Sequence, residues 1–449
     1  LNSSFINTIA YENGGAICGA MYSTHGTINV INSTFENTRA SDNGGAIYND
    51  RNVIVIGSTF TNTKAGNDGG AIFGNGGVSV VNSTFEETTS NRGSGGAILG
   101  KNSIFAVNST FINNKANKGG SIYIRGSGSI TVSESIFNHI VANVAGGAIY
   151  GEGGSNINVS DSIFNHTIAS SASGVIFDGV TLTGSVGTGG AIYSEGSVTV
   201  SESIFNHIVA NIDGGAIYSN GGGVTVVGST FNDTAANQGV GGVIRSKDSV
   251  FVTNSTFNRT IARFGGAIYG FNNVTVDNSI FNENSAKTHG ASIYTNGVLK
   301  VKDSTFNSNN ADGKAIIYIK SSNKDINLIN NTINSNLLAI YNDGGNIISQ
   351  TYLIFNNVTC AVGTNTTLNA LLSDDKGNSI GSNTLVEGKV GYTDVTFVFD
   401  ELTKMFTAKY SQTQTAGLYL ITGSYDLAAK CKVIAGLLNA QSIPNFSDS

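Results

Sequence analysis

Three carboxylates recur at one fixed position of a repeating pattern in this chain. They stand three residues before successive phenylalanines, at Glu134, Asp161 and Glu202. Stacked carboxylates supply oxygen ligands for a hard cation such as calcium, and paired carboxylates are what a polysaccharide-cleaving enzyme needs. The other repeats place asparagine or glycine there, apart from Asp303 before Phe306. Asparagine fits a backbone corner with a positive φ angle. The position therefore leaves a cation site and a plain corner both open, and we assign no metal ligand to it.

Three histidines follow the same pattern two residues after the phenylalanines, at His139, His166 and His207. Imidazole is the commonest metal ligand among side chains, so a ladder of histidines favours a zinc site. However, residues 133–143 and 201–211 are the same eleven residues, and copying of a module accounts for His207 without any chemistry. We assign no zinc site, and the sequence predicts neither a metal nor a cofactor.

A repeat of about 25 residues must position these side chains. The phrase Gly-Gly-Ala-Ile-Tyr occurs five times unchanged, and looser copies fill the gaps between them. A phenylalanine marks each repeat from Phe5 to Phe306, with steps of 24 to 30 residues except for one step of 41 between Phe164 and Phe205. The excess lies in residues 173–188, which form either an extra partial coil or a lateral loop. A fixed period of this length is the signature of a solenoid.

Each repeat is predicted to contain three short strands. In residues 69–94, the strand-forming segments are Ala71–Phe73, Val78–Val81 and Ser83–Phe85, which are rich in β-branched and aromatic residues. The polar remainder is predicted to be a connection. Three strands per coil predict an all-β protein with a right-handed parallel β-helix of about 13 coils over residues 1–348, the hand following from that of parallel crossovers. Successive coils should lie about 4.8 Å apart.

Two nearly invariant columns are predicted to point into the interior. One is the phenylalanine, replaced by Ile333 at the end, and the other is the isoleucine of Gly-Gly-Ala-Ile, which runs from Ile17 to Ile316. Valines such as Val78 and Val80 should line a third wall. Burial of each side chain is worth roughly 1.5–3 kcal/mol. In a single coil, this burial cannot compensate for the conformational entropy that its residues lose on folding. Neighbouring coils must therefore share one core.

The residue after that isoleucine should face outward, because side chains alternate along a strand. It is usually aromatic, and Arg245 in the same column is easier to place outside than in a core. The column predicts an exposed aromatic stripe, which is either a stack that stabilises neighbouring strands or a platform for sugars or a partner protein. The candidate binding stripe comprises Tyr48, Phe73, Tyr123, Tyr150, Tyr193, Tyr218, Tyr269 and Tyr294.

The composition changes from Tyr352 onward, where longer alternating segments replace the repeat. Six or seven predicted strands suit a small Ig-like β-sandwich over residues 352–435, followed by a tail or linker at 436–449. Cys360 and Cys431 lie on its first and last predicted strands. If those strands are neighbours, the two cysteines form a disulfide, and the sequence leaves this open.

The composition also restricts the classes of partner. The net charge of −6, without any basic cluster, argues against nucleic acid. No apolar run approaches the roughly 20 residues that span a bilayer, so no membrane span is expected in this segment. Because Leu1 begins inside a repeat, we expect a mature or excised piece of a longer protein.

The repeated motifs resemble those of two families of surface proteins. Gly-Gly-Ala-Ile, together with Phe35-Glu36-Asn37 and Phe60-Thr61-Asn62, is similar to the repeats of the chlamydial polymorphic outer-membrane proteins. The match is closer to the adhesin-like surface proteins of methanogenic archaea, whose coils precede Ig-like domains with a phrase like Gly417-Leu418-Tyr419. The resemblance implies an exported, glycosylated, extracellular protein that mediates adhesion at the cell surface, and it transfers no catalytic residue.

Three functions are open on these grounds. The leading one is a non-enzymatic stalk or adhesin that binds glycans or proteins on the surface of another cell. The alternative is a polysaccharide-degrading β-helix enzyme, a lyase or hydrolase, but the arginines and acids do not converge by spacing and we assign no catalytic residue. A third is an ice-binding face on the threonine column before phenylalanine, which Ile136, Ile163 and Ile204 interrupt.

Overall fold

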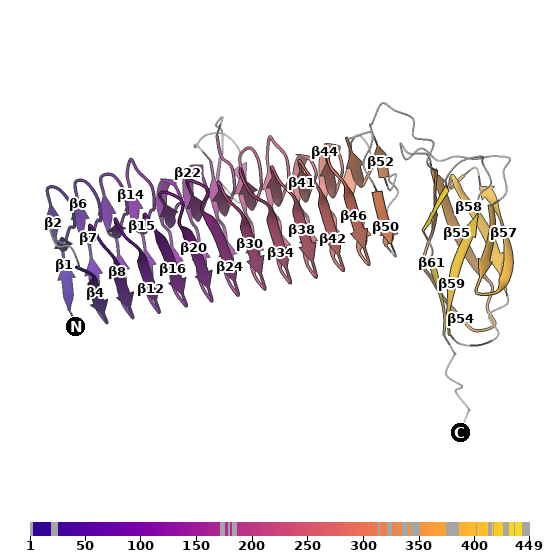
Figure 1. Cartoon of the computed structure of the whole chain (residues 1–449), viewed down its shortest axis with the longest axis horizontal. Helices are drawn as coiled ribbons and strands as arrows, with labels where there is room; N and C mark the ends of the chain where they lie inside the picture. Colours follow the sequence, from indigo (N-terminus) through magenta and orange to yellow (C-terminus); the bar gives the residue numbers. More distant parts are fainter. Residues whose placement is uncertain are drawn as a thin grey trace, which may run out of the picture.

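A computed structural model shows a long stack of β-coils followed by a second group of strands (Figure 1). Every regular element among the described residues is a β-strand. The described part of the chain contains no helix with the length and apolar character needed to cross a membrane. The structure describes residues 3–18, 26–170, 176–177, 180–181, 186–312, 315–320, 326–329, 331–334, 340–342, 351–373, 386–400, 402–411, 415, 417–424, 431–434 and 436–441.

The strands that carry the phenylalanines form one parallel sheet of 13 strands, which we call the Phe sheet. The strands from Thr34–Glu36 to Thr305–Asn307 each hold a buried centre between two outward-facing residues, and the centre of the first strand, Phe5, is half-buried. In order, they are β1 (Ser4–Ile6), β5 (Thr34–Glu36), β9 (Thr59–Thr61), β13 (Thr84–Glu86), β17 (Thr110–Ile112), β21 (Ile136–Asn138), β25 (Ile163–Asn165), β31 (Ile204–Asn206), β35 (Thr230–Asn232), β39 (Thr256–Asn258), β43 (Ile280–Asn282), β47 (Thr305–Asn307) and β51 (Thr332–Asn334).

The Gly-Gly-Ala-Ile segments form a second parallel sheet of 13 strands, the Ile sheet. Its register continues through Ile317, which pairs with Ile293, so Ile317 and not Ile316 extends the predicted column. Its strands are β3 (Ile17–Cys18), β7 (Ile47–Asn49), β11 (Ile72–Gly74), β15 (Ile98–Gly100), β19 (Ile122–Ile124), β23 (Ile149–Gly151), β29 (Ile192–Ser194), β33 (Ile217–Ser219), β37 (Ile244–Ser246), β41 (Ile268–Gly270), β45 (Ile293–Thr295), β49 (Ile317–Ile319) and β52 (Ile340–Asn342).

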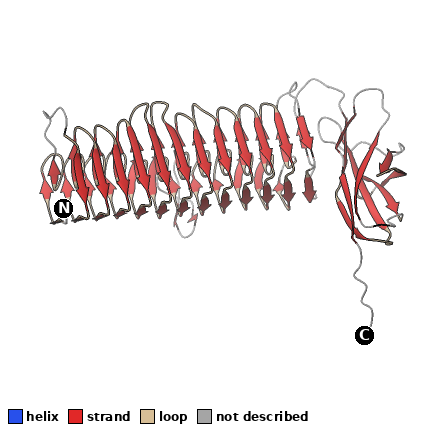
Figure 2. Cartoon of the chain, turned by 60° about the horizontal axis from the view of Figure 1, so that its bottom comes forward, coloured by secondary structure: helices blue, strands red, loops and turns tan. Residues whose placement is uncertain are grey.

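The third predicted wall is a parallel sheet of 12 strands, the Val sheet. Its residues alternate between buried and outward-facing, as in Val53–Ile56, where Val53 and Val55 are buried and Ile54 and Ile56 are exposed. Figure 2 shows the strands following one another along the stack of coils. Its strands are β4 (Ile28–Ile31), β8 (Val53–Ile56), β12 (Val78–Val81), β16 (Ser103–Val107), β20 (Ser129–Ser133), β24 (Asn156–Ser160), β30 (Val198–Ser201), β34 (Val224–Val227), β38 (Val250–Thr253), β42 (Val274–Asp277), β46 (Leu299–Lys302) and β50 (Ile326–Ile329).

A fourth parallel sheet of 12 short strands lies in the segment that was predicted to be a connection. Each coil therefore has four strands, and the prediction of three is wrong. Most of these strands bury only one alanine or serine, so the sequence carries no apolar alternation there. They are β2 (Ile9–Ala10), β6 (Arg39–Ala40), β10 (Lys64–Ala65), β14 (Thr89–Ser90), β18 (Lys115–Lys118), β22 (Val141–Ala145), β26 (Ile168–Ala169), β32 (Val209–Ala210), β36 (Ala235–Ala236), β40 (Ile261–Phe264), β44 (Ser285–His289) and β48 (Asn310–Ala311).

The phenylalanines form one continuous column through the interior, as predicted. Twelve rings from Phe5 to Phe306 make 11 stacked contacts, with ring centroids 4.6–5.2 Å apart. The rings from Phe35 onward are fully buried beside the Ile and Val columns, in one core that runs along the solenoid. The chain makes 11 turns between the first and the last of these twelve rings. The expected number of about 13 coils is too high, because it counted each phenylalanine and Ile333 as one coil.

Polar residues fix the corners on either side of the Phe sheet. The residue three positions before phenylalanine has a φ between 43° and 59° in every described coil from Asn32 to Asp303, which confirms the predicted left-handed corner. The serine that follows it is buried and links the coils: the Oγ of Ser58 accepts the N–H of Ser33 at 3.0 Å and donates to the carbonyl of Ile56 at 2.9 Å. This ladder accounts for the serine in the repeated Ser-Thr/Ile-Phe phrase.

The long step between Phe164 and Phe205 adds a lateral element. The strands β27 (Ile176–Phe177) and β28 (Val180–Thr181) pair antiparallel with each other and belong to none of the four stacked sheets. Phe164 and Phe205 still stack at 4.6 Å. The described residues therefore favour a lateral loop over an extra coil within 173–188.

Nine strands at the C-terminal end form a separate sheet with a core of its own. The order is β54-β61-β59-β56-β57-β58-β55-β53-β60. Ile354 of this sheet also belongs to the buried cluster of the solenoid, so it covers the end of that core. The strands are β53 (Thr351–Phe355), β54 (Val358–Ala361), β55 (Thr366–Ser373), β56 (Val386–Val390), β57 (Thr393–Asp400), β58 (Met405–Tyr410), β59 (Gly417–Ser424), β60 (Cys431–Ile434) and β61 (Gly436–Gln441).

The last of these strands corrects the predicted C-terminal boundary. Gly436–Gln441 pairs with β54 on one side and β59 on the other. These six residues were expected to open a tail or linker at 436–449, but their backbone hydrogen bonds place them inside the sheet. Two leucines and an alanine in a short segment carried too little alternation to reveal the strand from sequence.

Candidate functional site

The structure brings all eight residues of the candidate binding stripe into one column on the Ile sheet. Their rings stack between neighbouring coils, for example Tyr150 on Tyr193 at 4.4 Å and Tyr193 on Tyr218 at 5.0 Å. The stack continues beyond the predicted stripe, because Tyr294 lies on Tyr318 at 4.9 Å. The column is therefore a ladder of aromatic rings that spans neighbouring strands.

The stripe is not an exposed surface, so that part of the prediction is wrong. Tyr123 is 3% exposed, Tyr150 is 4% exposed and Tyr218 is 9% exposed, and the other members are buried or half-buried. The rings cover one another's faces, and Val144 and Ala145 pack against the same cluster. Alternation correctly turned these side chains away from the Phe core, but a second layer covers them. The buried stack therefore supports the stabilising interpretation of the column, not the sugar platform.

The phenol groups of the ladder reach charged partners at its edge. The hydroxyl of Tyr48 donates to Asp50 Oδ1 at 2.8 Å, and Lys118 Nζ lies 4.8 Å from the ring centroid of Tyr150. Burial, followed by the hydrogen bond to Asp50, raises the pKa of Tyr48 to about 12. Burial is also the main reason that the pKa of Tyr193 is raised to about 12, and it raises the pKa of Tyr123 and Tyr150 as well.

These raised values predict alkaline unfolding of the solenoid. Phenols of the unfolded chain ionise near pH 10, whereas Tyr48 and Tyr193 keep their protons to about pH 12. The stability that the ladder contributes is fully present below pH 10 and is lost as the pH rises through that interval. Denaturant unfolding at a series of pH values, with phenolate absorbance recorded in parallel, should show stability falling from about pH 10. A stability that stays constant to pH 12 would contradict the ladder.

Arg245 occupies the place of a ring in the same column, and it is buried. Only 7% of it is exposed, so it points away from the Phe core as expected but does not lie in solvent. Its guanidinium carbon lies 4.4 Å from the ring centroid of Tyr218 and 5.1 Å from that of Phe271. Its Nε lies 3.9 Å from Asp213 Oδ2. A planar guanidinium stacks on aromatic faces as another ring does, which is how the ladder accommodates a charge.

The Asp213–Arg245 pair is held by few polar contacts. Nε and Nη1 of Arg245 have no hydrogen-bond partner among the described residues. Burial raises the pKa of Asp213, opposed by the hydrogen bond from the Val240 N–H and by the charge of Arg245. Burying two charges costs more than such a pair returns unless its geometry is good.

We therefore expect opposite outcomes from two changes at this pair. Arg245→Ala leaves the half-buried carboxylate of Asp213 without its counter-charge and leaves a gap in the ladder, and should destabilise the fold by about 3 kcal/mol. The double variant Asp213→Asn with Arg245→Tyr restores residues that other coils use at these positions, and should be neutral or stabilising. Urea unfolding of both variants tests this. A double variant as unstable as Arg245→Ala would contradict this account of the pair.

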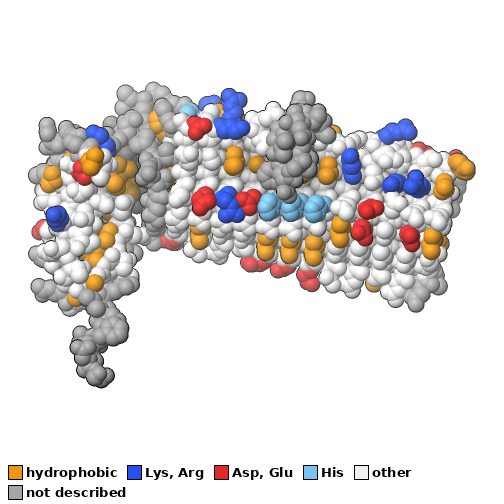
Figure 3. Space-filling model, turned by 180° about the vertical axis from the view of Figure 1, so that it is seen from behind, with side chains coloured by type: hydrophobic (Ala, Val, Ile, Leu, Met, Phe, Trp, Pro, Cys, Tyr) orange, Lys and Arg blue, Asp and Glu red, His pale blue; other side chains and the backbone are white. Residues whose placement is uncertain are grey.

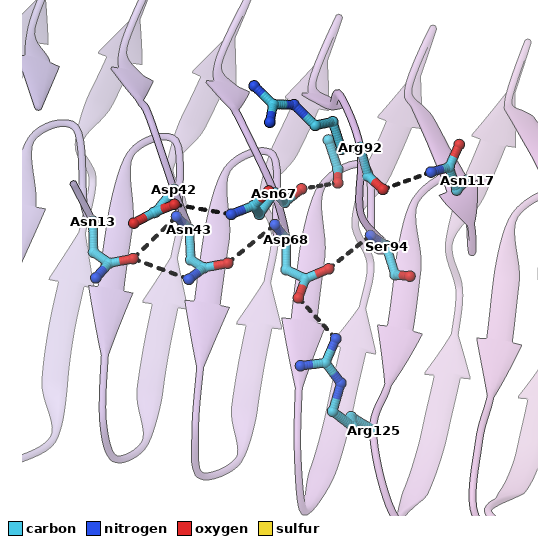
Figure 4. A network of polar contacts seen from close by, with 10 residues as sticks. Asn13, Asp42, Asn43, Asn67, Asp68, Arg92, Ser94, Asn117 and Arg125 are labelled. Atoms are coloured by element: carbon cyan, nitrogen blue, oxygen red, sulfur yellow. Dashed lines mark hydrogen bonds and ion pairs between the residues drawn. The ribbon is translucent and has the colours of Figure 1, made fainter. Parts of the chain in front are cut away.

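A second polar network crosses the outer turns of the first coils (Figure 4). The Oδ1 of Asn13 accepts the N–H of Asn43 at 3.1 Å, and the Oδ1 of Asn43 accepts the N–H of Asp68 at 3.1 Å. Asp68 Oδ1 accepts a hydrogen bond from the N–H of Ser94 at 2.8 Å, and Asp68 Oδ2 accepts one from Arg125 Nη2 at 2.7 Å. These bonds satisfy backbone donors between coils, so the network is structural.

The three histidines form a stack on the outer edge of the Phe sheet. His139 and His166 lie 4.7 Å apart and His166 and His207 lie 4.8 Å apart, with nearly parallel rings. They appear as a row of pale blue side chains in Figure 3. His207 Nε2 lies 3.8 Å from Asp233 Oδ2, and Arg259 Nε donates to Asp233 Oδ1 at 2.7 Å. The ladder thus continues into an ion pair.

The histidine positions have a backbone explanation that sequence reasoning missed. Their φ angles are 51–55°, and all other described coils also have a left-handed residue two positions after phenylalanine. Histidine is several-fold enriched in this region together with asparagine and aspartate. Within the described ranges, no group of three or more His, Cys, Asp or Glu side chains is arranged to hold a metal ion.

Sequence reasoning treated the acids, the exposed isoleucines and the histidines separately, but the structure places them on one surface. The register aligns Ile136 with Ile163 and Ile163 with Ile204. Glu134, Asp161 and Glu202 precede these residues in the same three coils and are all exposed. We call the three carboxylates and the three isoleucines the three-coil patch. In Figure 3 its hydrophobic and acidic rows lie next to the histidines. The identical segments 133–143 and 201–211 were the sequence signal for it.

A ladder of asparagines lies between the isoleucine row of the three-coil patch and the histidines, because Asn165 and Asn206 directly precede His166 and His207. Asn206 Nδ2 donates to Asn165 Oδ1 at 2.9 Å, and Asn232 Nδ2 donates to Asn206 Oδ1 at 2.8 Å. The same pattern continues through Asn258, Asn282 and Asn307. These amides bond to one another between coils, so the ladder stabilises the Phe sheet and presents a neutral polar strip.

The predicted disulfide finds no support. Cys360 is a free thiol of intermediate exposure. The strand of Cys360, β54, and the strand of Cys431, β60, stand at opposite ends of the strand order, so the premise that they are neighbours is wrong. A nine-stranded sheet inserts seven strands between two segments that a shorter sandwich would have paired.

Comparisons with known proteins give two partial matches. Residues 167–333 match the family described as right handed beta helix region. Residues 108–125 match the Chlamydia polymorphic membrane protein repeat. No curated protein and no solved structure matches the chain. The first match supports the predicted right hand of the parallel coils, and the second supports the motif relation to the polymorphic membrane proteins.

Proposed function

We propose that this chain is a non-enzymatic, cell-surface adhesin-like protein whose solenoid is a rigid stalk that presents lateral surfaces to another cell. The uninterrupted column of twelve stacked phenylalanines carries the proposal. A solid core with four hydrogen-bonded sheets resists bending, and repeat solenoids present extended binding surfaces. The matches to the right-handed β-helix and to the polymorphic membrane protein repeat support a surface passenger.

The finer parts of this proposal rest on the sequence resemblance. These are kinship with adhesin-like proteins of methanogenic archaea, export to the cell exterior, glycosylation, and an Ig-like topology for the C-terminal sheet. The nine strands with their own buried cluster support an independent C-terminal module. The contact surface differs from the expected one, because the aromatic stripe is buried and the outward rows of the Phe sheet are exposed.

Adhesion by beads coated with the chain tests the function. The coated beads should bind to microbial cells or to glycans on an array, whereas beads coated with the unfolded chain should not. Incubation with microbial and plant polysaccharides should release no reducing ends. Release of reducing ends by the wild-type chain would instead establish the polysaccharide-degrading enzyme. Failure of the beads to bind any cell or glycan would leave an inert spacer and remove the adhesive function.

A further inference from the structure

We propose that the three-coil patch binds a protein segment in which lysine or arginine alternates with large apolar side chains. The inference rests on the proposed adhesive function, and it names both the surface and the partner class. It depends on two rows that occur together in only three neighbouring coils among the described part of the solenoid. One row is outward-facing isoleucine, with Ile136 and Ile204 exposed and Ile163 half-exposed, and the other is carboxylates without a counter-charge.

The first row is apolar where the solenoid is usually polar. Ile136 is 41% exposed and Ile204 is 40% exposed. The coils on either side have Thr110 and Thr230 at the same register position. Isoleucine in place of threonine on a solvated strand exposes apolar surface, and a partner that removes this surface from water gains free energy.

The second row is an uncompensated line of negative charge. Glu134, Asp161 and Glu202 are all exposed, and none of them forms an ion pair with a described residue. They stand one coil apart, where like charges repel one another even in water. The flanking coils hold neutral Asn108 and Gly228 at this position. A cationic partner removes the repulsion and adds attraction, whereas a neutral glycan does neither.

The spacing of the rows suits an extended peptide. Each carboxylate precedes its isoleucine by two residues, which places the rows roughly 7 Å apart across the sheet. A peptide laid along the solenoid axis sends alternate side chains to opposite sides. One set then covers the isoleucine row, and the other set reaches the carboxylate row.

A second copy of the chain suits this surface less well. Its net charge is −6, and its own patch would bring three more carboxylates to the contact. Like charges that face each other across an interface weaken the complex and slow the association of the two molecules. The sign of the row therefore favours a basic partner over self-association.

The chain supplies its own replacement residues for a test. Glu134, Asp161 and Glu202 are changed together to asparagine, which six other repeats have three residues before phenylalanine. In a second variant, Ile136, Ile163 and Ile204 are changed to threonine. A control variant removes three acids elsewhere, as Glu36→Gln, Glu86→Gln and Glu87→Asn, and changes the net charge equally. Fluorescence anisotropy then measures binding of a labelled Lys-Val-Lys-Val-Lys-Val-Lys peptide, with a Ser-Val peptide of the same length for comparison.

The wild-type chain should bind the lysine peptide, and raising NaCl from about 50 to 500 mM should weaken this binding. The asparagine variant should bind at least about tenfold more weakly, the threonine variant several-fold more weakly, and the control variant as the wild type does. An equal loss in the control variant would show only non-specific charge attraction. Absence of wild-type binding, or equal binding of the Ser-Val peptide, would also overturn the proposal.

The outcomes separate the site from the adhesive function. If the beads adhere to cells and still adhere after the asparagine changes, the adhesive function is supported but this site is not responsible for it. If the peptide binds through the three-coil patch but the beads adhere to no cell, the binding site is supported and the adhesive function is contradicted. Concentration-dependent dimers that the threonine variant abolishes would identify the patch as a self-interface and overturn the basic partner.

Discussion

Replacing Phe231 by alanine is expected to destabilise the solenoid by about 3–5 kcal/mol, the range for large-to-small changes of buried aromatic residues. Phe231 is fully buried and stacks on Phe205 at 4.8 Å and on Phe257 at 5.2 Å. Alanine removes both ring contacts and leaves a cavity that the rigid coils above and below cannot close. Urea unfolding followed by far-ultraviolet circular dichroism measures the loss.

The neighbouring residue provides the control. Thr230 lies on the same strand and points outward, half-exposed. Thr230→Ala should change stability by less than about 1 kcal/mol, because no cavity forms and only a weak strand preference is lost. Since repeat arrays unfold partly by nearest-neighbour steps, hydrogen exchange should show the greatest loss of protection in the coils of Phe205, Phe231 and Phe257. Equal effects of the two changes would contradict a close-packed phenylalanine column.

Gly215→Ala is expected to be at least as damaging, with a loss of more than about 4 kcal/mol, as befits a steric change in the core. A Cβ at this position would clash with the Gly242 carbonyl oxygen of the next coil, far inside the normal contact distance of the two atoms. The N–H of Gly215 also donates to the Gly241 carbonyl at 2.9 Å. The coil would have to move away from its neighbour, which would break the backbone hydrogen bonds between the two coils at that point.

Gly77 is the matched control for this change. Its backbone is not left-handed, and a Cβ there would come no closer than 3.3 Å to a neighbouring atom, the Ser103 carbonyl oxygen. Gly77→Ala should therefore leave the unfolding midpoint within a few degrees of wild type, whereas Gly215→Ala should lower it by far more or prevent folding. A thermal melt of both variants decides this, and a tolerant Gly215→Ala would mean that the coils are less tightly stacked than described.

The two glycines of each repeat serve different purposes, and the sequence indicated only the first. Gly214 has a φ of 62°, which confirms that a tight left-handed corner requires glycine there. Gly215 has no such angle, and it is glycine because the next coil passes too close for a side chain. That approach is a contact between residues 27 positions apart, which no local rule of turn chemistry contains.

The sequence by itself determined the repeating fold of this protein. A period of about 25 residues, with Phe205 and Ile217 each in a nearly invariant column, specified which side chains are buried. It could do so because every coil has the same arrangement of inward and outward positions. The left-handed corners at positions such as Asn82 followed from the preferences of single residues. Such features are local or periodic, and a sequence displays them directly.

Only the tertiary structure decided what covers each outward face and which rows meet on it. Alternation turned Tyr150 and Arg245 away from the core, but the stacking of coils buried them both. The surface on which Glu202 and Ile204 lie beside their counterparts in two other coils arises because strand pairing aligns residues far apart in the chain. Exposure and proximity are set by how the coils stack, and the order of residues along the chain does not contain them.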